Sequence, residues 1–152
     1  MLKVHLECDL HGYESICNQN HGNAIDVLLQ VSQSISLHLQ QFNPTHLFEL
    51  QKYYPEQFKA FWDNKRASIY NHVKDNLSQG INQNLYRKDL NVELITTLYT
   101  HHLQYFSVLN EDLFEKFKHE EIFKTVFENH IRAITNKQGL EYFEQKKIEL
   151  QF

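Results

Sequence analysis

Residues 76–91 read NLSQGINQNLYRKDLN, and this stretch predicts the end of a long helix, a sharp exit and the capped start of the next helix. Gly80 interrupts an otherwise good helical pattern, where a glycine costs about 1 kcal/mol relative to alanine. Such a cost is tolerated most easily where a neighbouring backbone passes close by, so we expect a close approach at Gly80. Asn91 is placed to cap the next helix, with Glu93 in its first turn.

The composition favours helices within a single domain. A chain of 152 residues suits one domain, 1–152, and buries about two-thirds of its unfolded surface. Eleven Phe, eight Tyr and one Trp supply bulky core side chains, whereas four Gly and two Pro are too few for the turns of an all-β fold. We therefore expect an all-α fold, a bundle of about six to seven helices.

Charge and hydropathy exclude several classes of partner. The net charge is −4 with the ten His counted as neutral, and the Lys and Arg residues are scattered. Proteins that bind nucleic acids usually cluster Lys and Arg on one face, so we expect this chain alone not to bind duplex DNA specifically. No stretch approaches the roughly 20 apolar residues of a membrane span, and no signal peptide is recognisable. Two cysteines fit a reducing compartment, so the sequence predicts a cytoplasmic protein without a membrane partner.

Apolar residues recur at helical spacing along most of the chain. Asn23 follows a break and can cap the second helix, and Pro44 and Pro55 each suit the first turn of a helix. The predicted helices are Leu2–Asn18, a second ending at Asn43, a third opening at Pro44, a fourth from Pro55 through Leu85, a fifth near Val92–Leu109, a sixth near Lys118–Thr135 and a short terminal helix after Lys137-Gln138-Gly139.

The fifth and sixth predicted helices are apolar over arcs wider than a peripheral helix of a monomeric bundle needs. Either both helices lie in the core, or one face of each serves the monomer and the other face a partner subunit. In the second case, paired helices from two subunits would form a four-helix bundle, a common isologous interface.

A metal site and an enzyme active site are both poorly supported. Cys8, His11, Cys17 and His21 have a C-x2-H-x5-C-x3-H spacing that suggests zinc only weakly, because it matches no recognised zinc framework. Ordinary helix packing and exposed histidines explain this spacing more simply. The chain contains no nucleophile motif, phosphate loop or glycine fingerprint. The sequence therefore predicts no metal, no cofactor and no enzyme activity.

Aromatic residues gather around the start of the fourth predicted helix, at Tyr53, Tyr54, Phe58, Phe61 and Trp62. These rings either line a ligand pocket or simply fill the core. A few polar positions on otherwise apolar faces favour a pocket, although a buried, hydrogen-bonded core position is the simpler explanation of His102. We predict a small, largely apolar pocket between the second, fourth and fifth helices, with the ligand-binding residues Ser32, Phe58, Trp62, Lys65, Ile69 and His102.

Three segments of the chain share a pattern with one family of regulators. They are Asn43-Pro44, the LQKYYP segment at 50–55, and the G-I-x-x-x-L-Y-R-x-D-L pattern at 80–90. Together they give the chain from Asn23 onward a form that resembles the C-terminal domain of TetR-type transcription regulators. In such regulators an N-terminal helix-turn-helix domain binds DNA. The C-terminal domain binds effectors and dimerises through its last two major helices.

The resemblance implies a connecting helix at 1–22, pocket helices at 23–90, dimerisation helices at 91–136 and a C-terminal helix at 137–152. It implies a homodimer whose interface includes Leu98, Phe106, Val126, Phe127 and Ile131, and a small apolar or amphipathic effector. No helix-turn-helix precedes Leu2, so DNA would be bound only through a segment missing from this sequence. The expected function is ligand sensing and dimerisation in a regulator that represses transcription when full length. The alternative is a stand-alone helical dimeric scaffold or binding protein without a ligand switch.

Overall fold

The computed structural model describes residues 22–41, 44–107 and 115–150, and within helices it leaves the side chains at 38–41, 44–48, 103–107 and 119 undescribed. Six α-helices and no β-strand run through these residues. The helices are α2 (Ala24–Gln41), α3 (Pro44–Tyr53), α4 (Pro55–Asn82), α5 (Val92–Ser107), α7 (His119–Ile134) and α8 (Lys137–Glu149). The all-α prediction is therefore confirmed. The predicted first helix, with its cysteines and histidines, lies outside the described residues.

The helix starts follow the predicted local signals. The side-chain oxygen of Asn23 accepts hydrogen bonds from the backbone N–H groups of Ile25 and Asp26, both at 3.0 Å, and so caps α2. Asn91 caps α5 through the N–H of Leu94, also at 3.0 Å. Both caps satisfy donors that have no partner within the first helical turn. The helices α3 and α4 begin at the two prolines, as predicted.

The fourth helix ends earlier than the sequence predicts. It stops at Asn82 rather than continuing through Leu85. Asn84 follows with a φ of 58°, in the left-handed region that asparagine tolerates better than most residues. The backbone N–H groups of Leu85 and Tyr86 then turn back to the carbonyl oxygen of Gly80, at 2.9 and 3.1 Å. These two bonds close the exit from the helix.

The terminal helix begins earlier than the sequence predicts. It starts at Lys137, because the side chain of Asn136 caps it by accepting a hydrogen bond from the N–H of Gly139 at 2.9 Å. Gly139 therefore lies inside the first turn rather than before the helix. Farther along α8, Phe143 is fully buried, while Ile148 is 79 % exposed and takes no part in the core.

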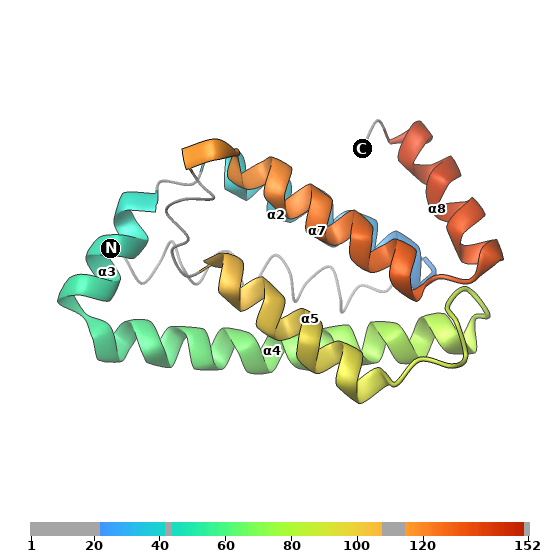
Figure 1. The fold of residues 1–152 in the computed structure, drawn as a ribbon, viewed down its shortest axis with the longest axis horizontal. Coiled ribbons are helices and arrows are strands. Elements are labelled where there is room, and N and C mark those ends of the chain that lie inside the picture. The colour runs from blue at the N-terminus through green and yellow to red at the C-terminus, as the bar shows by residue number, and fades with distance from the viewer. Residues whose placement is uncertain (1–21, 42–43, 108–114, 151–152) are drawn as a thin grey trace.

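The helices lie in two layers, which Figure 1 shows from the side. The long α4 lies along one layer with α5 packed against it, and α2 and α7 pack together in the other. The two layers meet where α2 packs on α4, and α3 packs on α4 near the start of α4. Between the layers lies one apolar core, whose buried side chains are Ala24, Ile25, Leu28, Leu29, Val73, Leu77, Leu85, Tyr86, Phe127, Ile131, Ile134 and Phe143.

The loop after α4 is joined to the connection between α7 and α8. Tyr86 and Thr135 form an isolated antiparallel bridge, and backbone hydrogen bonds of 2.9 and 3.0 Å lie on either side of it. We call the two paired segments, 84–87 and 134–136, the clasp. The clasp fixes the end of α4 to the end of α7, although the two ends lie far apart in the sequence.

A chain of buried polar groups continues from the clasp to the start of α2. The Tyr86 hydroxyl donates to the side-chain oxygen of Asn76 at 2.9 Å, and the Asn76 amide donates to the Ala24 carbonyl oxygen at 2.8 Å. The side-chain oxygen of Gln83 accepts from the Ala24 N–H at 2.8 Å. Because each of these groups has a partner, the network links α2, α4 and the clasp without an unpaired polar atom.

Two glycines allow the close packing around the clasp. A Cβ atom added at Gly80 would lie 2.1 Å from the ring of Tyr86. The predicted close approach is therefore present, but the neighbour is an aromatic ring rather than a backbone. At Gly139 the neighbour is a backbone, because a Cβ there would lie 2.0 Å from the carbonyl oxygen of Leu85.

Candidate ligand-binding site

Four buried polar side chains in the described part of the chain each carry an atom without a hydrogen-bond partner. They are Ser32 and Ser36 of α2, Trp62 of α4 and Thr100 of α5. Each of the four is more than nine-tenths buried. Since an unpaired buried polar group costs about 1–3 kcal/mol, native interiors contain few of them and each needs an explanation.

Several other helical hydroxyls among the described residues have partners. Those of Ser78, Thr96 and Thr125 each donate to the carbonyl oxygen four residues earlier, at 2.9, 2.6 and 2.8 Å. This bond is the ordinary local partner of a hydroxyl inside a helix. Thr100 lies one turn after Thr96 on α5, yet its hydroxyl is unpaired. Its side chain therefore gives up a local hydrogen bond that its neighbour makes.

Of the unpaired groups, those of Ser36 on α2 and Trp62 on α4 lie at a similar level of the bundle. The two helices run in opposite directions, and the hydrogen bond from Asn76 to Ala24 fixes their alignment. With a rise of about 1.5 Å per residue, Ser36 lies about 18 Å along α2 from Ala24, and Trp62 about 21 Å back along α4 from Asn76. Ser32 lies one turn nearer the clasp on the same face of α2. The alignment therefore brings Ser36 close to the level of Trp62, whereas Ser32 lies about 9 Å from that level along the helix axis.

Aromatic rings and a cation surround Trp62. The rings of Phe58 and Phe61 meet it edge-on, with centroids 6.1 and 5.5 Å away. The ammonium group of Lys65 lies 5.3 Å from the centre of the Trp62 ring and 5.5 Å from that of Phe61. Both distances suit cation–π attraction, so a positive charge lies directly beside the indole.

The predicted ligand-binding residues fall into three groups. Ser32 and Trp62 are buried, and Phe58, Lys65 and Ile69 are half-buried and share a face of α4 with Trp62. His102, in contrast, is exposed, so the alternative in which it is a buried core histidine is wrong. Leu98 is 62 % exposed one turn earlier, because this side of α5 faces away from the core.

Two residues of the candidate site were missed by the sequence analysis. Ser36 and Thr100 are buried and unpaired, but neither was predicted to bind a ligand. Their spacing carried a signal, because Ser36 lies one turn after Ser32 and Thr100 one turn after Thr96. A repeated hydroxyl on the buried face of a helix was the pattern to look for.

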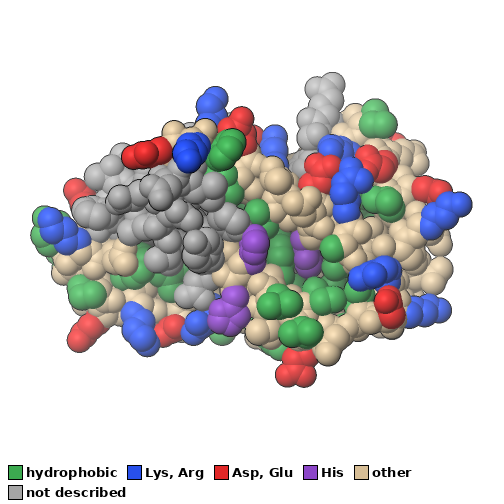
Figure 2. Space-filling model, viewed as in Figure 1, with side chains coloured by type: hydrophobic (Ala, Val, Ile, Leu, Met, Phe, Trp, Pro, Cys, Tyr) green, Lys and Arg blue, Asp and Glu red, His purple; other side chains and the backbone are tan. Residues whose placement is uncertain are grey.

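The predicted interface residues are not all on the surface. Phe127 and Ile131 are 2 % and 0 % exposed in the core of this chain, so their side chains offer no surface to a second subunit. Val126 is half-buried, and the side chain of Phe106 lies outside the description. Leu98 and Leu94 are exposed one turn apart on α5, and Figure 2 shows hydrophobic side chains gathered over this helix. Dimerisation stays a prediction, and the outer face of α5 is one surface in the described part of the chain that could serve it.

A stacked pair of rings connects α5 to α7. Tyr99 and His130 lie face to face, with centroids 3.7 Å apart and planes inclined by 16°. Burial lowers the pKa of His130 to about 4, so the imidazole is neutral at physiological pH. Burial also raises the pKa of Tyr99 well above its usual value. The pair is therefore an uncharged contact between α5 and α7.

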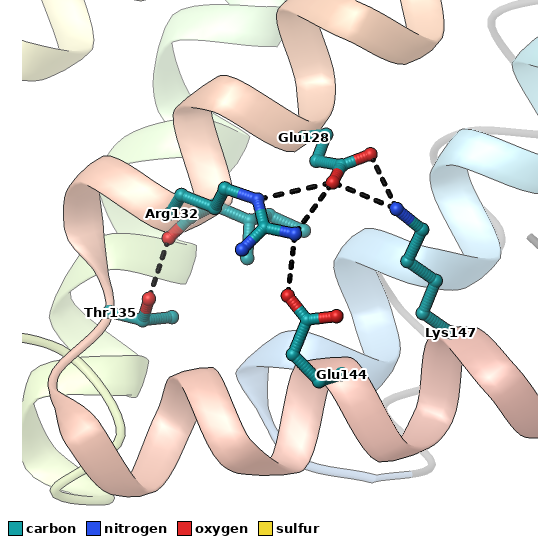
Figure 3. A network of polar contacts seen from close by, with 6 residues as sticks. Glu128, Arg132, Thr135, Glu144 and Lys147 are labelled. Carbon is teal, nitrogen blue, oxygen red and sulfur yellow. Dashed lines mark hydrogen bonds and ion pairs between the residues drawn. The ribbon is translucent and has the colours of Figure 1, made fainter.

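An ion-pair network holds α8 beside α7, as Figure 3 shows. Glu128 of α7 accepts hydrogen bonds from Lys147 of α8 at 2.8 Å and from Arg132 at 2.7 Å, and Arg132 also pairs with Glu144. The hydrogen bonds from Lys147 and then Arg132 lower the pKa of Glu128. All four side chains are partly exposed, so the network is a surface feature and no candidate for chemistry.

Within the described ranges, no group of three or more His, Cys, Asp or Glu side chains is arranged to hold a metal ion. No helix in this part of the chain is long and apolar enough to cross a membrane. Comparison with known protein families, characterised proteins and solved structures finds no match for this chain. The described residues form an all-helical structure in which four buried polar side chains each have an atom without a hydrogen-bond partner.

Proposed function

We propose that this chain is a ligand-sensing and dimerisation domain of a transcription regulator of the TetR type, and that the full-length regulator represses transcription. The observation that carries the proposal is the set of unpaired groups on Ser32, Ser36, Trp62 and Thr100. In this proposal the DNA reader is a helix-turn-helix segment outside these 152 residues.

The unpaired groups support a binding site because they oppose stability. Replacing an unpaired buried hydroxyl by an apolar group of the same shape is neutral or stabilising. Sequence features that oppose folding, such as an unpaired buried polar group, are found most often at functional sites, where binding or catalysis requires them. A ligand that supplied the missing hydrogen bonds would remove the cost and would bind the folded chain only. That selective binding is what a sensor needs.

The arrangement of the helices supports coupling between a ligand and a subunit interface. The three helices that carry the unpaired groups include α5, whose outer face exposes Leu94 and Leu98. A ligand that bound one position of α5 better than another would change how that face meets a second subunit. The stack of Tyr99 on His130 would pass the same movement to α7.

A stand-alone dimeric scaffold is the second candidate, and the clasp favours it. The buried network of Tyr86, Asn76 and Ala24 is fully paired, so this end of the molecule is built for rigidity. A scaffold would use the exposed leucines of α5 in the same way but would have no ligand response.

A ligand screen by thermal unfolding separates the two candidates. The protein would be heated with a library of small apolar and amphipathic compounds, alongside the Ser36→Ala, Thr100→Val double variant. The sensor proposal predicts compounds that raise the melting temperature of the wild-type chain and have a much smaller effect on the variant. If no compound in a broad library changes the melting temperature of the wild-type chain, the sensor proposal is wrong and the scaffold proposal remains.

A further inference from the structure

The packing of α4 differs between the two parts of the helix. Every side chain of α4 is described. The buried residues of this helix are Trp62, Val73, Asn76, Leu77 and Gly80. All of them except Trp62 lie in residues 73–82, next to the clasp, so Trp62 is the single buried residue of 55–72. The part of α4 away from the clasp therefore has little packing to hold it against its neighbours.

The buried core is gathered beside the clasp. From α2 its buried members all come from residues 24–29, and from α4 they are Val73 and Leu77. Farther along α2, Ser36 is buried but Leu37 is 62 % exposed. We call residues 32–41 of α2 and 55–72 of α4 the far end, and Figure 1 shows them at the opposite end of the bundle from the clasp.

The far end also holds most of the unpaired polar groups. Ser32, Ser36 and Trp62 each bury an atom without a hydrogen-bond partner there. These groups need not meet at one point, because each of them separately regains a partner when water reaches it. An opening of the far end therefore recovers three lost hydrogen bonds to water, which lowers the free energy of the open state.

The residues around the clasp have the opposite character. The Asn76 side chain accepts from the Tyr86 hydroxyl at 2.9 Å and donates to the Ala24 carbonyl oxygen at 2.8 Å. We call the clasp together with residues 24–29 of α2 and 73–82 of α4 the clasp end. Opening it would break these buried bonds and expose the core, so it requires unfolding of the whole chain.

We propose that the far end opens and closes as a local unit while the clasp end stays folded. A single helix detached from its neighbours is marginal in water, so the backbone amides of 55–72 exchange with solvent while the far end is open. The inference concerns the chain without a ligand and is independent of the proposed sensor function.

Native-state hydrogen exchange of the full chain tests the proposal. Protection factors would be compared between residues 59–69 and 76–82, which both lie inside α4. We expect protection at 76–82 to be about a hundredfold higher or more, because only global unfolding exposes those amides. Low urea should accelerate exchange more steeply at 76–82, since global unfolding exposes more surface than local opening. Equal protection along α4 would overturn the proposal.

The variant Tyr86→Phe then separates local from global opening. It removes the hydroxyl that donates to Asn76 and leaves a buried oxygen unpaired. Protection at 76–82 should therefore fall about tenfold. Protection at 59–69 should stay unchanged, because the clasp end is folded whether the far end is closed or open.

Tyr70→Phe is the matched control, because it removes a hydroxyl from a half-buried tyrosine of α4. It should leave the protection at 76–82 unchanged. If Tyr86→Phe lowers protection equally in both segments of α4, the helix opens as one cooperative piece and the inference is wrong.

The outcome is distinguishable from that of the ligand screen. Uniform protection along α4 in a chain that binds a compound refutes this inference alone. Local opening of the far end in a chain that binds no compound supports this inference, while the proposed sensor function fails.

Discussion

Gly80, which belongs to the resemblance pattern, leaves no room for a larger side chain. Alanine is the better helix former, so helix propensity alone predicts that Gly80→Ala stabilises α4 by about 1 kcal/mol. The ring of Tyr86 at 2.1 Å from the added methyl predicts the opposite, because overpacking a filled site typically costs about 1–3 kcal/mol. We expect urea unfolding to show a loss of stability. Asn71→Ala, at an exposed position of α4, should lose nothing. A Gly80→Ala chain as stable as the wild type would show that the ring moves aside freely.

His130 makes the stability depend on pH in the acidic range. Burial favours the neutral imidazole in the folded chain, with a pKa of about 4 against an ordinary 6.5. Below pH 6.5 the unfolded chain therefore binds the proton first. The stability contributed by the neutral ring is complete above pH 6.5 and is lost as the pH falls through about 4.

His130→Phe tests this dependence, since it keeps a ring against Tyr99 and removes the titration. Between pH 6.5 and 4 the wild type should lose up to about 3 kcal/mol more free energy of unfolding than the variant. His101→Gln, at an exposed position of α5, should follow the wild-type curve. Parallel pH curves for the wild type and His130→Phe would refute the assignment.

At the residue scale, the sequence was informative where the cause is local. Asn23, Asn91 and the two prolines start their helices as predicted, because capping and proline geometry depend on a few adjacent residues. The ring beside Gly80 and the unpaired hydroxyl of Thr100 depend on segments that are distant in the sequence. Periodicity cannot reveal such neighbours.

At the element scale, α8 shows which kind of contact holds a helix in place. Phe143 is completely buried, and truncating a buried phenylalanine costs about 3–5 kcal/mol. The ion pairs of Glu128 are partly exposed, and pairs of that kind contribute about 0–1 kcal/mol. Phe143→Ala should therefore destabilise the chain several-fold more than Glu128→Gln in free energy of unfolding.

Raising the ionic strength sharpens that comparison. The small loss in Glu128→Gln should shrink further in 1 M salt, because ions screen exposed charges, while the loss in Phe143→Ala should persist. Equal losses for the two variants at low salt would mean that the network in Figure 3 holds α8 as firmly as the core does.

The apolar arc of α5 shows what the sequence of a single helix could not predict, namely which of its apolar residues face the core. The sequence left open whether this arc was core or interface. The structure divides it, with Ile95 and Tyr99 packed against the core and Leu94 and Leu98 exposed. The apolar arc of α7 instead packs into the core of the same chain, since Phe127 and Ile131 are buried. Both helices have similar patterns, so only the packing of the whole chain could separate them.

At the scale of the whole molecule, the exposed leucines of α5 predict a dimer. Leu98→Glu should give a monomer with nearly unchanged stability, because the side chain is 62 % exposed in the single chain and its charge stays hydrated there. In a dimer the charge would be buried without a partner. Ile148→Glu, at a more exposed apolar position on α8, is the matched control and should stay dimeric.

Sedimentation velocity measures this directly. A wild-type chain that sediments as a monomer at all accessible concentrations would end the dimer prediction. A dimer that survives Leu98→Glu would move the interface away from α5.

The central claim is that the buried unpaired groups serve binding at the cost of stability, and one pair of variants tests it. Thr100→Val removes an unpaired hydroxyl, while Thr96→Val removes one that donates to the Val92 carbonyl at 2.6 Å. The two sites are one turn apart on α5 and both are buried. In urea unfolding without ligand, we expect Thr100→Val to raise the free energy of unfolding by about 1 kcal/mol and Thr96→Val to lower it by about 1 kcal/mol. A Thr100→Val chain destabilised as much as Thr96→Val would show that the hydroxyl of Thr100 is an ordinary part of the core, and would contradict the account.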